Sequence, residues 1–169
     1  METIYTVIVV ILLVLAILGL VVGVSNDAVN FLNSAIGSKA ASRKVIFTIA
    51  SVGILLGTMT SSGMMEVARS GVFYPEMFTF RDVMMLFLGV MFANVILLDL
   101  FNTFGLPTST TVSLVFELLG GTFALSLIRV NNDATLALGD LINTDKALSV
   151  IMAIFVSVAI AFFFGMLVQ

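Results

Sequence analysis

Five long apolar segments divide the chain, and they constrain its fold more than any other feature. They cover residues 4–24, 45–65, 83–104, 108–128 and 147–168. An α-helix needs about 20 mainly apolar residues to cross a lipid bilayer, and each segment reaches that length. The sequence therefore predicts an all-α, polytopic transmembrane bundle that forms a single domain over residues 1–169.

The composition excludes several classes of function. The chain is 60% hydrophobic and 10% charged, and it contains no histidine, cysteine or tryptophan. Because imidazole bases, thiol nucleophiles and Cys/His metal sites are therefore absent, we expect neither an enzyme nor a bound cofactor. The net charge is −3 and no long run of basic residues occurs, so we also expect no binding of nucleic acid.

A basic connection after the first segment sets the expected orientation. Residues 25–44 hold a polar stretch followed by Lys39, Arg43 and Lys44, and basic connections favour the cytoplasmic side. We expect a multi-pass protein of the plasma (inner) membrane with its N-terminus outside, and with its C-terminus inside if all five segments cross. A polar linker at residues 129–146 separates the last two segments.

Three acidic residues lie within or against the apolar segments, where no Lys or Arg neutralises them. They are Asp27, Asp99 and Glu117. Ionisable residues in membrane segments are costly and usually functional. Asp99 can also be explained as a carboxylate near a helix end that reaches interfacial water. For Glu117 the alternative is protonation or a hydrogen bond to a neighbouring helix, and we treat it as a proton or gating candidate.

The fourth segment begins with four consecutive hydroxyl residues, 108–111, directly after Pro107. The backbone N–H groups of a first helical turn have no intrahelical partner, and together with the helix dipole they bind anions. An ordinary Ser/Thr N-cap is the simpler interpretation. Thr110, Ser113 and Glu117 share one helical face, however, and this polar stripe favours an anion site.

The acidic residues and the hydroxyl-rich helix start conflict electrostatically unless a cation lies between them. An anion at the helix start would be repelled by Asp27 and Asp99 in a medium of low dielectric constant. Asp and Asn oxygens suit Na+, and carboxylates can bind protons instead. Asp99 and Asn102, three residues apart, are further candidate ion ligands. The residues thus indicate coupled transport of an anion and a cation.

Only Gly105, Leu106 and Pro107 separate the third and fourth segments, so these segments form a tight helical hairpin. The hairpin can be joined by a short turn at the membrane surface. It can instead be a broken or re-entrant pair whose tip lies at membrane depth beside a polar cavity. The polar residues next to the turn favour the second interpretation.

Two motifs resemble the inorganic phosphate transporter (PiT) family. N-D-A-V-N at 26–30, continuing F-L-N-S-A-I-G-S to residue 38, is similar to the family signature G-A-N-D-V-A-N-A-F-G-T-S-V-G-S. G-L-P-T-S-T-T at 105–111 is similar to the family element L-P-V-S-T-T-H. The resemblance implies symport of phosphate with Na+ or H+, the substrate and ions being held between two inverted repeats. It assigns the ion and phosphate site to Asn26, Asp27 and Asn30, and phosphate contacts to Ser109, Thr110 and Thr111.

The chain also departs from the family pattern. Two residues instead of one separate Gly23 from the Asn-Asp pair, the second segment has no acidic residue, and Val112 replaces a histidine, which favours Na+ over H+. One copy of the signature is present where the family has two. The chain therefore resembles an N-terminal half, either a part of a longer protein, which the charge bias favours, or a half-size subunit that pairs in inverted orientation.

In either case the expected partner is a second transporter half. Two other functions stay open. The hydroxyl and N–H groups would also fit another oxyanion such as sulfate, and the chain could be a non-transporting scaffold subunit of a membrane complex.

Overall fold

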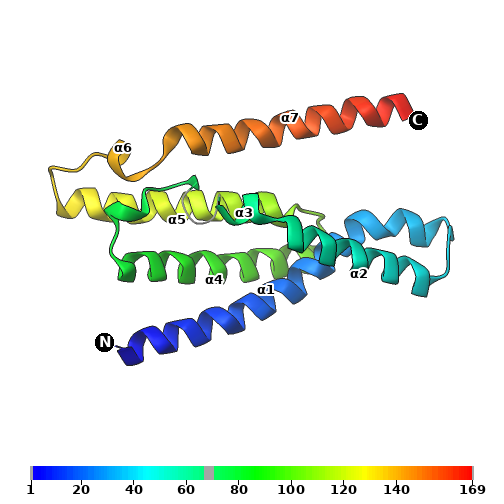
Figure 1. Ribbon diagram of the computed structural model, residues 1–169, viewed down its shortest axis with the longest axis horizontal. Helices are drawn as coiled ribbons and strands as arrows, with labels where there is room; N and C mark the ends of the chain where they lie inside the picture. The colour runs from blue at the N-terminus through cyan, green and yellow to red at the C-terminus, as the bar shows by residue number, and fades with distance from the viewer. Residues whose placement is uncertain (1, 67–70, 169) are drawn as a thin grey trace.

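The computed structural model describes residues 2–66 and 71–168, and in the view of Figure 1 its long helices run mainly along the longest axis of the molecule. Within these described ranges, five helices are long and apolar enough to cross a membrane, which confirms the predicted all-α transmembrane bundle. These are α1 (Glu2–Gly37), α2 (Arg43–Thr60), α4 (Phe80–Phe104), α5 (Thr110–Asn132) and α7 (Thr144–Val168). Short helices α3 (Ser62–Glu66), η2 (Pro75–Met77) and α6 (Leu138–Leu141) lie in the connections.

Helix α1 is much longer than the first apolar segment. It is a single helix of 36 residues, so the polar signature continues the helix beyond residue 24 and the connection shrinks to 38–42. Its length is about 54 Å at 1.5 Å per residue. Figure 1 shows α1 changing direction along its course. Ser25 Oγ donates to the carbonyl of Val21 at 2.8 Å, and Asn102 Nδ2 donates to that of Val22 at 3.1 Å. Side-chain donors on helical carbonyls are a known cause of such bends.

Other predicted boundaries also move. Helix α2 ends at Thr60, and the rest of the second segment forms the separate helix α3. Helix α5 begins at Thr110 instead of residue 108, because Ser109 is its N-cap and accepts a hydrogen bond from Val112 N at 3.4 Å. The linker between α5 and α7 shrinks from 129–146 to 133–143, since both helices extend through polar residues.

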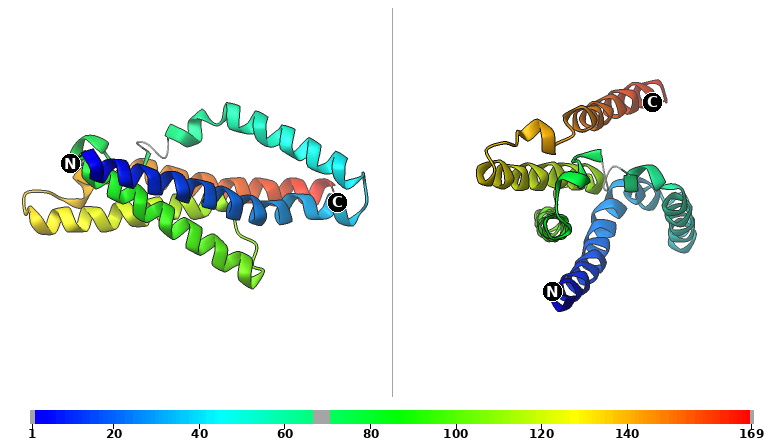
Figure 2. Two further views of the ribbon diagram at one scale, coloured as in Figure 1. Left: turned by 90° about the horizontal axis from the view of Figure 1, so that it is seen from below. Right: turned by 60° about the vertical axis from the view of Figure 1, so that its left-hand side comes forward.

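Helix α4 lies between α1 and α5 and packs against both (Figure 2). Its buried residues recur every fourth position, at Leu86, Val90, Asn94 and Leu98, and so form one face. Gly121 of α5 allows a close approach there. A Cβ atom at this position would lie 2.8 Å from Leu86 Cδ1 and 3.1 Å from Val90 Cγ2.

The connections before α4 and after α5 pair with each other and close one end of the bundle. Tyr74 N donates to Leu141 O at 3.1 Å, and Asn143 N donates to Val72 O at 3.0 Å. Val72 and Leu141 are fully buried. These contacts hold the start of α4 beside the end of α5.

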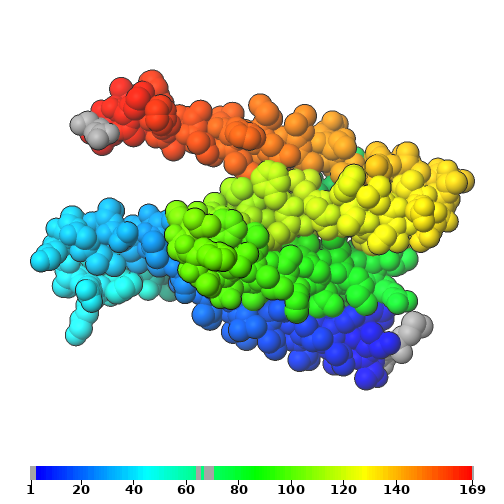
Figure 3. All heavy atoms as spheres, turned by 180° about the vertical axis from the view of Figure 1, so that it is seen from behind, coloured from blue at the N-terminus to red at the C-terminus, as the bar shows by residue number. Residues whose placement is uncertain are grey.

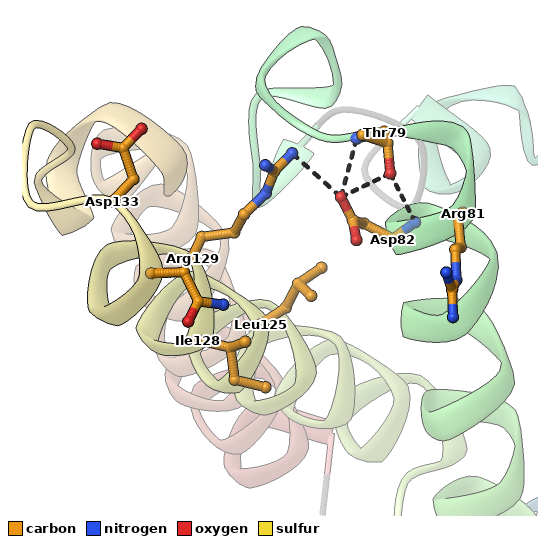
Figure 4. Close-up of a pocket in the computed structure, with 8 residues that line it drawn as sticks. Thr79, Arg81, Asp82, Leu125, Ile128, Arg129 and Asp133 are labelled. Atoms are coloured by element: carbon orange, nitrogen blue, oxygen red, sulfur yellow. Dashed lines mark hydrogen bonds and ion pairs between the residues drawn. The ribbon is translucent and has the colours of Figure 1, made fainter.

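An ion pair reinforces this end of the bundle. Arg129 Nη2 lies 3.1 Å from Asp82 Oδ2 and donates to Met77 O at 3.2 Å. Asp82 in turn forms a capping box with Thr79 at the start of α4. Figure 4 shows the Arg129 side chain reaching from α5 towards this cap. This ion pair holds the start of α4 against the end of α5, opposite the hairpin turn.

The hairpin between α4 and α5 turns tightly at Gly105, which has a φ of 65° that glycine adopts without strain. Leu106 N donates to Phe101 O at 2.9 Å and completes the helix cap. Figures 1 and 2 show that this tip lies beside the middle part of α1, while the end of α1 and the start of α2 extend beyond it. Helix α7 stands apart from the α4–α5 pair along its C-terminal part (Figure 3).

Candidate ion and anion site

Asp27 of α1 faces the first residue of α5. Thr110 Oγ1 donates a hydrogen bond of 2.9 Å to Asp27 Oδ2. The two helices pack closely here, since a Cβ atom on Gly23 would lie 3.5 Å from Thr110 Cγ2, an ordinary van der Waals distance. The structure therefore brings together two residues that are 83 positions apart and that the two sequence motifs had singled out separately.

A pocket of about 230 Å³ lies at this contact. Its polar lining comes from Asp27, Asn94, Thr110 and Thr111. No group in the described ranges accepts a hydrogen bond from the backbone N–H of Thr110 or Thr111. The pocket thus combines one carboxylate with the hydroxyl and N–H donors of a helix N-terminus.

Three asparagines fasten the hairpin tip to α1. Asn26, which is only 4% exposed, donates from Nδ2 to Asn102 Oδ1 at 2.8 Å. Its Oδ1 accepts from Thr108 N at 3.3 Å and from Asn30 Nδ2 at 3.5 Å. Asn30 Nδ2 also lies 3.0 Å from Thr108 O. In this structure these amides bond mainly to one another and to the backbone, and they hold the two motifs in register. We call this set the amide network.

The remaining predicted residues lie outside this contact. Ser109 is exposed and serves as the N-cap of α5. Asp99 is exposed, does not line the pocket beside Asp27, and its side chain has no hydrogen bond to the described part of the chain. Glu117 lies deeper along α5, where its Oε2 accepts from Asn94 Nδ2 at 2.9 Å.

Asn94 is the residue that sequence reasoning missed. It is 8% exposed, it lines the pocket beside Asp27, and its amide contacts Glu117. A single amide in the middle of an apolar segment was the available signal, because such residues form interhelical hydrogen bonds in membranes.

Comparison with known proteins identifies the family. A sequence model described as the phosphate transporter family matches residues 22–169. The chain belongs to this family. The match includes both motifs and helices α4, α5 and α7, which agrees with the resemblance inferred from residues 26–38 and 105–111.

A curated relative of this phosphate transporter family member is the "Putative phosphate permease" of Thermococcus kodakarensis. The two are 33% identical over 98 residues, which are 57% of this chain and 24% of the relative. The aligned part thus spans about a quarter of the relative's length. No solved structure matches the chain.

The pocket beside Asp27 in this family member brings charges of opposite sign close together. Among residues 2–66 and 71–168, no three Asp, Glu, His or Cys side chains gather closely enough to hold a metal ion. Asp27 contributes one negative charge, and the start of α5 contributes a partial positive charge. A cation at Asp27 would neutralise the carboxylate and allow an anion to approach the helix start.

Proposed function

We propose that the chain forms one half of a secondary transporter that carries inorganic phosphate across the plasma (inner) membrane, coupled to Na+ or H+. The observation that carries the proposal is the Asp27–Thr110 contact, which places a carboxylate against the hydroxyl-rich N-terminus of α5. Phosphate docks on the hydroxyl and N–H groups of Thr110 and Thr111, with Ser109 at the rim. The coupling cation binds at Asp27 between phosphate and α1.

The amide network supports this site by holding its two motifs together. The hairpin is held against α1 by Asn26, Asn30 and Asn102. When a hydrogen bond between two of these amides breaks, the side-chain oxygen that accepted it becomes a ligand for the cation. Asp99 is a weaker candidate ligand because it is exposed. A second transporter half supplies the other part of the site, as expected for sites between inverted repeats.

Phosphate uptake into proteoliposomes tests the proposal. We expect uptake driven by a Na+ or H+ gradient, with little competition from sulfate, because phosphate near neutral pH still carries a proton that it can donate to a carboxylate. Asp27→Asn should abolish ion-driven uptake, whereas Asp145→Asn, which changes an exposed acid of α7, should leave it intact. Sulfate outcompeting phosphate, or unchanged ion-driven uptake in Asp27→Asn, would overturn the proposal.

A further inference from the structure

The contact between Glu117 and Asn94 forms a second polar centre between α4 and α5. Asn94 Nδ2 donates to Glu117 Oε2 at 2.9 Å. The other oxygen, Oε1, is buried and has no hydrogen-bond partner in the described part of the chain. Only one of the two carboxylate oxygens of Glu117 therefore has a hydrogen-bond donor in the described part of the chain.

The surroundings of Glu117 favour its neutral form. It lines a pocket of about 280 Å³ whose other lining residues, from α4 and α5, carry no polar side chain. An ionised carboxylate in such surroundings is costly, because no charged side chain among the described lining residues compensates for its desolvation.

In the described ranges, no Lys or Arg side chain lines the pocket beside Glu117. Asp27 of α1 lines the same pocket as Asn94, the hydrogen-bond partner of Glu117. Arg129, the basic residue of α5, pairs with Asp82 at the far end of the hairpin. None of the other charged groups on these helices lines the pocket beside Glu117; they are Arg81, Asp82 and Asp99.

A metal cation fits this centre poorly. Na+ takes several oxygen ligands, but Asn94 presents its NH2 group to Glu117, and the adjoining pocket offers no second side-chain oxygen. A proton requires one carboxylate oxygen alone.

We propose that Glu117 is a proton-binding site, linked to the Asp27 pocket through Asn94. The carboxylate takes up one proton from water that reaches the pocket lined by Glu117 and later returns it to water, and no electrons are transferred. This inference rests on the proposed function in one respect: if the chain carries phosphate, the proton on Glu117 contributes to coupling beside the cation at Asp27.

Infrared difference spectroscopy of the full chain in lipid bilayers tests the site directly. Spectra recorded between alkaline and acidic buffer should show the carbonyl band of a protonated carboxylic acid, and this band should shift in D2O. Glu117→Gln should remove the band, while Asp145→Asn should retain it. Gln keeps the size of the side chain and an oxygen that accepts from Asn94, so the variant should fold.

A second variant keeps the test decisive. Asn94→Ala removes the donor to Glu117 Oε2, so the band should persist but move to higher frequency, as expected for a carboxylic acid that has lost a hydrogen bond. A purely structural role for Asn94 would not move a band that belongs to Glu117. An unchanged acid band in Glu117→Gln, or an unshifted band in Asn94→Ala, would overturn the proposal.

The infrared measurement needs no phosphate, so its outcome is separable from transport. A band that depends on Glu117 in a chain without phosphate uptake would support the proton site and contradict the proposed function. Phosphate uptake together with a band that Glu117→Gln leaves unchanged would contradict the proton site alone. If both proposals hold, Glu117→Gln should lose uptake driven by a pH gradient.

Discussion

Asn26 Nδ2 and Asn102 Oδ1 are joined by a hydrogen bond of 2.8 Å that links α1 to the last turns of α4. Asn26 also accepts from the backbone of the hairpin tip, so one nearly buried amide connects three separate parts of the chain. We expect Asn26→Ala to destabilise the fold by about 1–3 kcal/mol, because its partners would be left without a hydrogen bond. Thermal unfolding in detergent measures the effect. Asn33→Ala, at an exposed position of the same helix, is the control, and an equal loss in both variants would contradict the role of Asn26.

Thr110→Val tests the contact with Asp27. The substitution keeps the shape of the side chain but removes the hydroxyl that donates to Asp27 Oδ2. We expect a loss of about 1 kcal/mol in the free energy of unfolding. Thr48→Val is a suitable comparison, because Thr48 bonds only within its own helix at an exposed site. The same loss at both threonines would show that the interhelical bond contributes nothing specific.

Gly121 and Gly120 form a natural pair for testing the packing of α4 on α5. Gly121→Ala would place a Cβ atom 2.8 Å from Leu86 Cδ1 and should cost about 1–3 kcal/mol through overpacking. Gly120→Ala meets nothing within 4 Å and should stabilise α5 by up to about 1 kcal/mol, because alanine favours helix. Unfolding temperatures of the two variants should move in opposite directions. A shift in the same direction would mean that the helices do not approach each other at Gly121.

The expected orientation can be mapped with single cysteines, because the chain has none of its own. Ala41 lies in the basic connection after α1, and Ala137 lies in the linker before α7; both are exposed. With the N-terminus outside, a membrane-impermeant thiol reagent added to intact cells should label Ala137→Cys and spare Ala41→Cys. The reverse pattern would place the N-terminus inside.

Hydropathy predicted the number of long helices because it measures length and apolar content directly. It misplaced their ends wherever a helix continues through polar residues, as α1 does from Asn26 to Gly37. Hydrogen bonds within the backbone and between helices sustain those turns, and a count of apolar residues does not register them.

Part of the site could also be predicted, because polar residues next to apolar segments are visible in the sequence. Asp27 and Thr110 stand out as polar groups next to apolar segments, and the structure does join them. Asp99 was grouped with Asn102 by a three-residue spacing. That spacing leaves about 60° between the two side chains around a helix of 3.6 residues per turn, and Asn102 turns inward while Asp99 is exposed. Asn94 was overlooked because its partner, Glu117, comes from a different segment.

The hydrogen bonds and the ion pair along the α4–α5 hairpin affect how a solute can reach the pocket beside Asp27. The amide network holds its tip against α1, and the Arg129–Asp82 ion pair holds its other end. Parting α1 from the hairpin would break several hydrogen bonds at once, so we expect these three helices to move together. The pocket is also lined by Leu20 and Val24, whose side chains are exposed on α1. We therefore expect entry of a solute to depend on whatever packs over those two side chains more than on separation of the helices that form the pocket.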